Sequence, residues 1–440
     1  MAPCPPRSTS AAAASSAALL LALLASGAAS PPPCRSNEGE PGRFPTWPAT
    51  WVLQDSTIVQ PCNTSGYLDD SYAQFGVVSV DWSNAKQLWV VPPMSTEQMH
   101  VEQAARLKAV RPGVRVFGYR NIVKALPWFS AVRAAMDDPA YSGFFLRFAP
   151  NQTYHVPQCD KNYDPPKCTP YYHDEEQTPG YPSGDGNCPA PACDCGVHPC
   201  GEYLFDHRNG TMLQDWIVNE LLGPSLIGNS NISGAYLDDE WYNTTMYWGC
   251  SATPVGGATE EDGSCLADMG LQTQAFTTEM TDAWCATRHR AMEAARLSGG
   301  WFWQMFSLFS TPAQAQCAAV LRPLCAAGAS SAVYNATTMH SLSGDHATLP
   351  NLMQDLAAFL LLRGPYAYLG FGWSGCNVVT AFPDVLKTDL GAPQGFCSET
   401  ATGSGVFTRD WEKATVALDC NTYVGTVSPK AEARQRAQTS

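Results

Sequence analysis

Short apolar segments alternate with helical stretches at least six times between residues 75 and 373, and this pattern restricts the chain to few folds. "FGVVSVDW" (75–82) and "QLWVV" (87–91) are short apolar, β-branched runs. They are followed by a stretch of helix formers at 95–110 and then by "VRVFGYR" (114–120). Such alternation predicts parallel strands joined by crossover helices. Two architectures fit: a closed (β/α)8 barrel and an open doubly wound sheet.

The length of this region, about 300 residues, favours the TIM-like barrel. No glycine-rich dinucleotide fingerprint follows the first strand and no phosphate loop occurs, so we expect no cofactor. The later strands are expected at 203–210 (with a turn), 233–239, 300–306, 330–335 and 366–373. The later helices are expected at 121–138, 211–223, 271–297, 311–328 and 351–364.

The composition divides the chain into five parts. Residues 1–30 combine Arg7, an apolar run and small residues near Ala28–Ser30, which is typical of a cleaved signal peptide. A membrane anchor is the alternative, but the apolar run is short against the ~20 residues of a spanning helix. The other parts are a lead-in at 31–73, the barrel at 74–373 with a cysteine-rich insertion at 149–201, and a C-terminal β-strand segment at 374–430.

Cysteines and glycosylation sequons favour a secreted or cell-surface protein. Of 17 cysteines, Cys4 lies in the signal segment and 16 remain, an even number that predicts disulfides. We expect the insertion cysteines to pair mainly among themselves, and Cys250–Cys265 and Cys376–Cys397 to form local bridges. A zinc knuckle in "CPAPACDCGVHPC" is the alternative. Six Asn-x-Ser/Thr sequons predict a glycoprotein: Asn63, Asn151, Asn209, Asn231, Asn243 and Asn335.

The charge balance argues against some partners. The net charge is −14 and no run of Lys or Arg occurs, so nucleic acid and anionic membrane surfaces are not expected to bind. Only 15% of the residues are charged and 11% are aromatic, which suits a protein that meets neutral, hydroxyl-rich ligands. The 8 histidines are scattered, so no metal site is expected.

In a barrel, function lies at the carboxyl ends of the strands. Carboxylates, amides and aromatic rings fall there, the set needed to protonate a glycosidic oxygen and to stack on sugar rings. The expected catalytic residues are Asp238, Asp239, Glu240 and Asp206. The expected substrate-binding residues are Asp81, Trp82, Tyr119, Arg120, Asn121, Arg208, Trp241, Gln304 and Trp373.

The triplet Asp238–Glu240 ends the segment "ISGAYLDDEW". Crowded acids raise one another's pKa, as a general acid near neutral pH requires. Strand alternation would place Asp238 and Glu240 on one face and Asp239 on the other. The acids could instead cap a turn or bind calcium, and Asp206 could cap a helix or pair with Arg208.

"YLFDHRNGTMLQDWIV…ISGAYLDDEW", the "YRN" at 119–121 and "FTRDWEKATVAL" resemble glycoside-hydrolase-like TIM barrels. The resemblance covers roughly residues 75–427. It implies Asp238 or Asp239 as the key acid, Asp206 at the preceding strand end, and a carbohydrate substrate. The alternative is a catalytically inactive carbohydrate-binding or structural barrel. A carboxyl separation of ~5–5.5 Å would indicate a retaining enzyme and ~6.5–9.5 Å an inverting one.

Overall fold

The structure is a computed structural model. It describes residues 50–90, 92–150, 158–160, 163–173, 195–239, 241, 274–304, 307–335, 337–373 and 375–430. Several predictions lie outside these residues: the signal peptide, Glu240, the bridge between Cys250 and Cys265, and most of the proposed zinc knuckle.

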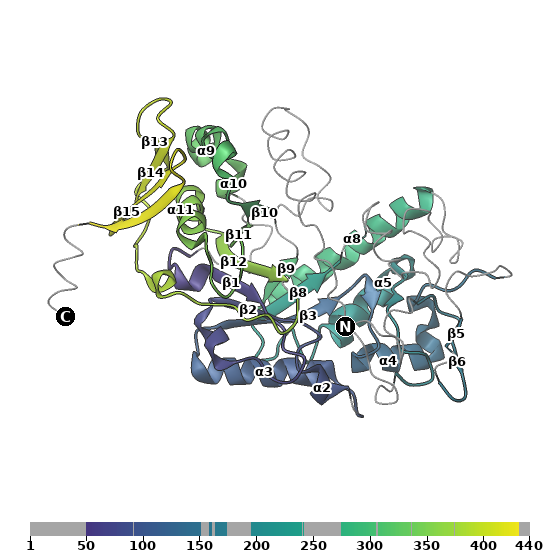
Figure 1. The fold of residues 1–440 in the computed structure, drawn as a ribbon. Helices are drawn as coiled ribbons and strands as arrows, with labels where there is room; N and C mark the ends of the chain where they lie inside the picture. Colours follow the sequence, from purple (N-terminus) through teal and green to yellow (C-terminus); the bar gives the residue numbers. More distant parts are fainter. Residues whose placement is uncertain are drawn as a thin grey trace, which may run out of the picture.

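An eight-stranded parallel sheet forms the centre of the molecule (Figure 1). Its strands follow the order β10-β11-β12-β1-β2-β3-β8-β9. They are β1 (Thr57–Gln60), β2 (Val77–Val80), β3 (Arg115–Asn121), β8 (Gly234–Asp238), β9 (Trp301–Gln304), β10 (Ser307–Ser310), β11 (Thr338–Ser341) and β12 (Ala367–Trp373).

This order is a cyclic permutation of the chain order, because β12, the last strand of the sheet, pairs with β1. In a doubly wound sheet the strand order reverses at a switch point, whereas here the order continues in one direction across the sheet. The doubly wound alternative is therefore wrong. The sheet's two edges, β9 and β10, are separated only by residues 305–306. Three Cα–Cα steps span at most about 11 Å, so the sheet must curl until its edges are close.

The close pairing of β1 and β12 depends on Gly370. A Cβ atom at Gly370 would lie 1.7 Å from the backbone oxygen of Ile58, so only glycine fits. β1 itself lies within the segment expected to be an irregular lead-in, and that boundary is therefore wrong for this strand. Its four residues are buried but too few to show periodicity, and only pairing on both sides makes them a strand.

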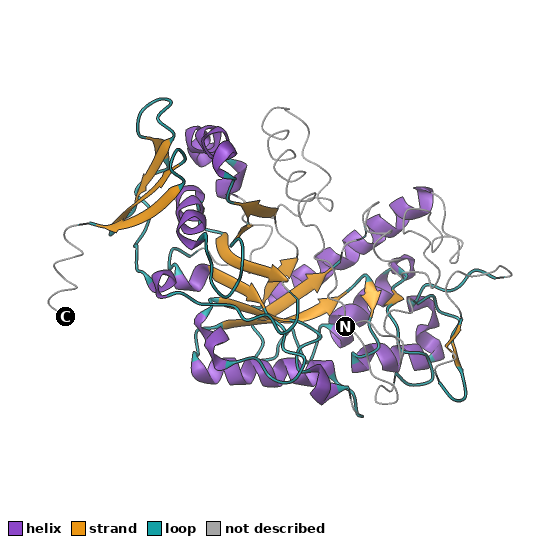
Figure 2. Ribbon diagram, viewed as in Figure 1, coloured by secondary structure: helices purple, strands orange, loops and turns teal. Residues whose placement is uncertain are grey.

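Helices surround the sheet (Figure 2). The α-helices are α2 (Lys86–Trp89), α3 (Thr96–Val110), α4 (Ser130–Asp137), α5 (Thr211–Trp216), α8 (Gln274–Leu297), α9 (Gln314–Ala327), α10 (Ala332–Asn335) and α11 (Leu352–Leu362). Short 3-10 turns are η1 (Gln54–Ser56), η2 (Asp70–Gln74), η3 (Pro139–Phe144), η4 (His207–Asn209), η7 (Gly328–Ser330) and η8 (Asp384–Lys387), and α5 continues as a π-turn, η5 (Ile217–Leu221).

The local sequence explains where helix α3 begins. Ser95 caps α3, since its side chain accepts a hydrogen bond from the backbone of Gln98.

Two expectations about the positions of helices and strands are wrong in detail. The segment 121–138 is helical only over α4, because β3 continues to Asn121. The strand expected at 330–335 is the helix α10, and the strand β11 follows it.

The connection from β3 to β8 carries two small antiparallel ladders. β4 (Lys124–Ala125) pairs with β7 (Tyr203–Leu204), and β5 (Cys159–Asp160) pairs with β6 (Lys167–Cys168). The strand expected at 203–210 is therefore β7, which lies outside the main sheet. In the main sheet β8 pairs directly with β3.

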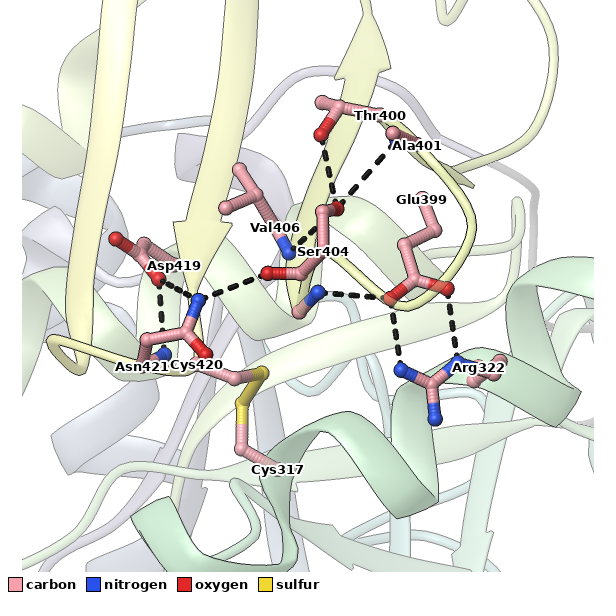
Figure 3. A network of polar contacts seen from close by, with 11 residues as sticks. Cys317, Arg322, Glu399, Thr400, Ala401, Ser404, Val406, Asp419, Cys420 and Asn421 are labelled. Carbon is pink, nitrogen blue, oxygen red and sulfur yellow. Dashed lines mark hydrogen bonds and ion pairs between the residues drawn. A yellow bond between two sulfur atoms is a disulfide. The ribbon is translucent and has the colours of Figure 1, made fainter.

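A four-stranded antiparallel sheet follows the main sheet, as the alternating C-terminal segment predicts. It consists of β13 (Ser398–Glu399), β14 (Val406–Asp410), β15 (Ala414–Asp419) and β16 (Val424–Pro429). Two disulfides, Cys317–Cys420 and Cys325–Cys397, fasten it to α9. The guanidinium of Arg322 on α9 also forms two hydrogen bonds with the Glu399 carboxylate, at 2.8 and 2.7 Å (Figure 3).

All described cysteines are disulfide-bonded. Cys159–Cys168 and Cys195–Cys200 both lie within the segment 149–201, which confirms local pairing for these four. The expected bridge between Cys376 and Cys397 is wrong, because Cys376 pairs with Cys62 and Cys397 with Cys325. The expected bridge was based on closeness in sequence. Cys62 and Cys376 instead meet because the loops after β1 and β12 become neighbours when those two strands pair. None of the described helices has the length and apolar character needed to cross a membrane.

Candidate active site

Three neighbouring strands carry an aromatic layer beneath their polar ends. Tyr119 on β3 is in register with Tyr236 on β8, and the two ring centroids are 5.9 Å apart. The ring of Trp303 on β9 lies 4.9 Å from that of Tyr236. Because side chains alternate along a strand, Asn121 and Asp238, two residues further on, extend from the same face. The rings thus form an aromatic layer directly adjacent to these polar residues on the same face of the sheet.

Asp238 is the last residue of β8 and keeps only part of its surface accessible. The hydroxyl of Tyr119 donates to its Oδ2 at 2.9 Å, and the hydroxyl of Tyr236 donates to its Oδ1 at 3.3 Å. Burial among protein atoms raises the pKa of Asp238 to about 7, and the charge of Asp239 adds to the increase. The expectation that crowding raises the pKa of these acids holds for Asp238, with burial as the larger cause.

Asp239 differs from Asp238 in backbone and in surroundings. Its φ of 56° lies in the left-handed region, which non-glycine residues rarely occupy. Strand alternation therefore ends at Asp238 and no longer decides the direction of the next side chain. The Asp239 carboxylate accepts a hydrogen bond from Asn121 at 2.7 Å and lies 3.9 Å from the ammonium of Lys124. Both contacts hold the carboxylate in place.

Asn121 connects the two carboxyl groups. Its Oδ1 accepts from the backbone N–H groups of Val123 and Lys124, at 2.8 and 2.7 Å, which fixes the orientation of the amide. Its Nδ2 is therefore free to donate to Asp239 and, at 3.2 Å, to the hydroxyl of Tyr119. A continuous chain of hydrogen bonds thus runs from Asp238 through Tyr119 and Asn121 to Asp239.

Lys124 was missed by the sequence reasoning. Its ammonium donates to Glu202 at 2.5 Å, and both side chains are largely buried. The pairing of β4 with β7 brings these residues together from positions 78 apart in the chain. The only signal in the sequence was a basic residue three positions after Asn121.

Asp81 follows β2 and is buried. Desolvation raises its pKa to about 6, against the opposing hydrogen bonds from Ser83. Its charge also raises the pKa of Tyr119, so it belongs to the same electrostatic environment as Asp238. A carboxylate oxygen of Asp81 lies within 4.8 Å of the sulfurs of Cys62 and Cys376. Those sulfurs form a disulfide, so this group does not provide thiolate ligands for a metal ion.

The predicted aromatic residues lie in different environments. Trp82 is partly buried and stacks on Trp128 with ring centroids 4.5 Å apart, while the ammonium of Lys86 lies 5.0 Å from its ring. Trp241 is buried. Trp373, at the end of β12, is 50% exposed and is the one predicted aromatic with a broad accessible surface.

Arg120 does not belong to the site, and its assignment to substrate binding is wrong. It points to the opposite face of β3, where it is fully buried and donates to the backbone oxygen of Leu221 and the hydroxyl of Ser225. Alternation explains this, because Tyr119 and Asn121 occupy the other face. A guanidinium buried this way cannot reach a ligand at the strand ends.

Asp206 and Arg208 form a local pair. Two side-chain hydrogen bonds, at 2.8 and 2.6 Å, join them, and Asp206 also caps η4 by accepting from the backbone of Arg208. Asp206 follows β7, so placing it at the end of a main-sheet strand is wrong. Gln304 ends β9, but its side chain and the whole of Glu240 lie outside the described residues.

No family model matches the sequence, and no curated protein is similar to it. Among the solved structures similar to this chain are glycoside hydrolases. A debranching enzyme from Nostoc punctiforme, soaked with acarbose, is 8% identical with a TM-score of 0.40, covering 85% of this chain and 90% of that one. A cyclic α-maltosyl-(1→6)-maltose hydrolase from Arthrobacter globiformis, in complex with its substrate, is 10% identical with a TM-score of 0.38, covering 84% and 91%.

An α-amylase from H. orenii is 10% identical with a TM-score of 0.34, covering 77% of this chain and 74% of that one. These scores are all below 0.5 and carry no conclusion about activity.

Proposed function

We propose that the protein is a glycoside hydrolase in which Asp238 and Asp239 form the catalytic pair. The observation that carries the proposal is the hydrogen-bond chain from Asp238 through Tyr119 and Asn121 to Asp239. It joins one carboxyl group with a raised pKa to a second carboxylate held by an amide and an ammonium. Glycosidic cleavage requires such a pair, one member protonated and the other charged.

Asp238 acts as the proton donor in this proposal. Its proton passes to the glycosidic oxygen as the bond to the anomeric carbon breaks, and the leaving sugar departs as an alcohol. Asp239 stabilises the positive charge at the anomeric carbon, either through space or by forming a covalent bond to it. Water then adds at that carbon and gives up a proton, to Asp238 if the configuration is retained and to Asp239 if it is inverted. The α:β ratio of the first product, measured by NMR, decides between retention and inversion.

The proposed framework is a closed barrel. The two edges of the sheet, β9 and β10, belong to one short stretch of chain, and this supports closure through the segment that contains both strands. β9 pairs with β8, and β10 pairs with β11. One interrupted strand would then complete the circle, giving seven strand positions in place of the eight expected.

Substrate contacts are proposed for Asp81 and Trp373, and Trp82 follows Asp81 in the chain. The exposed ring of Trp373 can stack on a sugar, and the buried Asp81 can accept hydrogen bonds from hydroxyl groups. Secretion and N-glycosylation are proposed as well. The disulfides among the described cysteines are compatible with an oxidising compartment.

The test is release of reducing ends by the purified, secreted protein from a panel of neutral glycans: starch, pullulan, cellulose, xylan, chitin and β-glucan. Turnover of at least one glycan, lost in Asp238→Asn, supports the proposal. Binding to a glycan without turnover, unchanged in Asp238→Asn, would instead support the inactive, carbohydrate-binding alternative. Turnover that persists in both Asp238→Asn and Asp239→Asn would move the active site elsewhere.

A further inference from the structure

A cavity lies at the end of the main sheet opposite to Asp238. It has a volume of about 340 Å³ and opens between the first residues of three neighbouring strands: Arg115 of β3, Gly234 of β8 and Trp301 of β9. The loop 226–233 and the turn 298–300 complete its wall. Asp238 lies at the other end of β8, so the cavity is separate from the proposed active site.

Arg115 supplies the charge in this cavity. Its guanidinium lies over the ring of Trp301, 4.0 Å from the centroid. It makes one long hydrogen bond, 3.4 Å, to the backbone oxygen of Asp55, while the carboxylate of Asp55 pairs with Arg111 at 3.2 Å. Within the described ranges no ion pair joins Arg115 to a carboxylate.

The surroundings are basic although the chain as a whole is strongly acidic. Lys108 donates to the backbone oxygen of Ser230, a wall residue, at 3.2 Å. Arg111 and Arg115 both contact one acidic residue, Asp55, and Lys108 reaches the cavity wall. Burial lowers the pKa of Arg115, and the charge of Arg111 lowers it further, against the opposing effects of Tyr368 and Asp55. A bound anion would offset this excess of positive charge.

We propose that this cavity binds an acidic saccharide, with the carboxylate of a uronic acid on Arg115. The planar guanidinium matches a carboxylate through two parallel hydrogen bonds. Asn229, Ser230 and Ser298 in the wall can contact sugar hydroxyls, and Trp301 and Ile232 supply apolar surface. The volume is at the small end of ligand sites, which run from about 300 to 1,000 Å³. The binding step involves no covalent change.

Calorimetric titration of the full-length secreted protein tests the proposal with three probes. Glucuronate is the ligand, glucose is the neutral sugar of matched shape, and acetate is the bare carboxylate. Glucuronate is expected to bind at least about tenfold more tightly than either, because only it combines charge and hydroxyls. Equal binding of glucose would overturn the role of Arg115. Equal binding of acetate would overturn the claim that the ligand is a saccharide and would indicate a site for simple anions.

Two variants locate the binding. Arg115→Gln should lose at least about tenfold in affinity. Arg147→Gln is the matched control, since Arg147 also lies over an aromatic ring, Tyr171 at 5.3 Å, but outside the cavity. If Arg115→Gln does not fold, Ala295→Leu fills the cavity from its wall and should abolish binding with Arg115 intact. Unchanged affinity in the folded variant would overturn the proposal.

Asn231 is the acceptor residue of a sequon and lies within the loop that lines the cavity. The effect of a glycan attached there must therefore be distinguished from binding of the ligand. Glucuronate binding should persist in Asn231→Gln, and loss of binding through this change alone would overturn the cavity as the site. Glycan turnover at Asp238 should be the same in Arg115→Gln and the parent, so the two proposals can fail independently.

Discussion

The side-chain amide of Asn121 donates to the carboxylate of Asp239 at 2.7 Å, across the ends of two neighbouring strands. Two backbone N–H groups hold the other end of that amide, so the donor is oriented before any ligand arrives. A preorganised donor stabilises a charge without reorganisation at the moment of reaction. The pair therefore holds the Asp239 carboxylate in a fixed position, while burial raises the pKa of the neighbouring Asp238.

Replacing Asp238 with Asn should abolish turnover and preserve the fold. The change keeps the shape and removes a group whose ionised form is poorly solvated. Activity on a cleavable glycan is expected to fall by a factor on the order of 10² to 10⁴, the size of a general acid contribution. Thermal unfolding checks the fold, and a melting temperature equal to or above that of the parent is expected. A lower melting temperature with unchanged turnover would mean that Asp238 is structural.

Stability should depend on pH through the same residue. Because burial raises the folded-state pKa of Asp238 from 3.8 to about 7, the folded protein binds more protons than the unfolded chain between these values. The free energy of unfolding should therefore fall as pH rises from about 4 to about 7. Asp81, with a folded-state pKa of about 6, acts in the same direction. Denaturant titrations at several pH values should give a flatter profile for Asp238→Asn than for the parent.

Turnover should decline above about pH 7, when Asp238 loses its proton. Removing the positive charge of Lys124, which lowers the pKa of Asp238, should move this decline to higher pH. Lys124→Met should also reduce kcat by about tenfold or more, because Asp239 loses a cation 3.9 Å away. The measurement is a kcat/KM profile from pH 4 to 9.

Two controls separate this effect from simple destabilisation. Lys124→Met leaves Glu202 without its ammonium partner, so the double variant Lys124→Met/Glu202→Gln should recover stability but not the parent pH profile. Lys387→Met removes an exposed lysine elsewhere and should change neither the stability nor the pH profile of turnover. An unshifted profile in the folded Lys124 variant would contradict the proposed role.

Trp373→Ala should weaken substrate binding without unfolding the protein. Half of this side chain is exposed, so its removal leaves no cavity in the core. Stacking on a sugar ring is expected to contribute about 1 kcal/mol, so KM should rise about fivefold while kcat changes little. Val379→Ala, an exposed apolar residue in the following loop, is the control. Equal effects of the two variants would argue against a stacking role for Trp373.

Peptide mapping without reduction should recover Cys62 joined to Cys376 and Cys325 joined to Cys397. Thiol titration of the denatured, unreduced protein should find almost no free thiol. The bridge from Cys62 to Cys376 spans 314 residues, so Cys62→Ser/Cys376→Ser should lower the free energy of unfolding by about 3–5 kcal/mol. A peptide joining Cys376 to Cys397 would contradict the structure.

Sequence periodicity predicted the strands that end at Trp373 and Asp238, and the antiparallel C-terminal sheet, because these segments carry their own pattern. It failed for β1, whose four buried residues are too few to show a period, and for 203–210, which forms a strand outside the main sheet. A strand partner is a property of the whole sheet, and a short segment does not encode it.

The sequence by itself determined which acids end β8, since a buried apolar run followed by carboxylates has few other solutions. Only the tertiary structure decided what surrounds them. Lys124 and Glu202 meet through the β4–β7 ladder, Tyr119 and Asn121 reach Asp238 and Asp239 through the β3–β8 register, and Arg120 turns away on the opposite face. A carboxyl group's pKa depends on the burial and charges within a few ångströms, and those neighbours come from segments far apart in the chain.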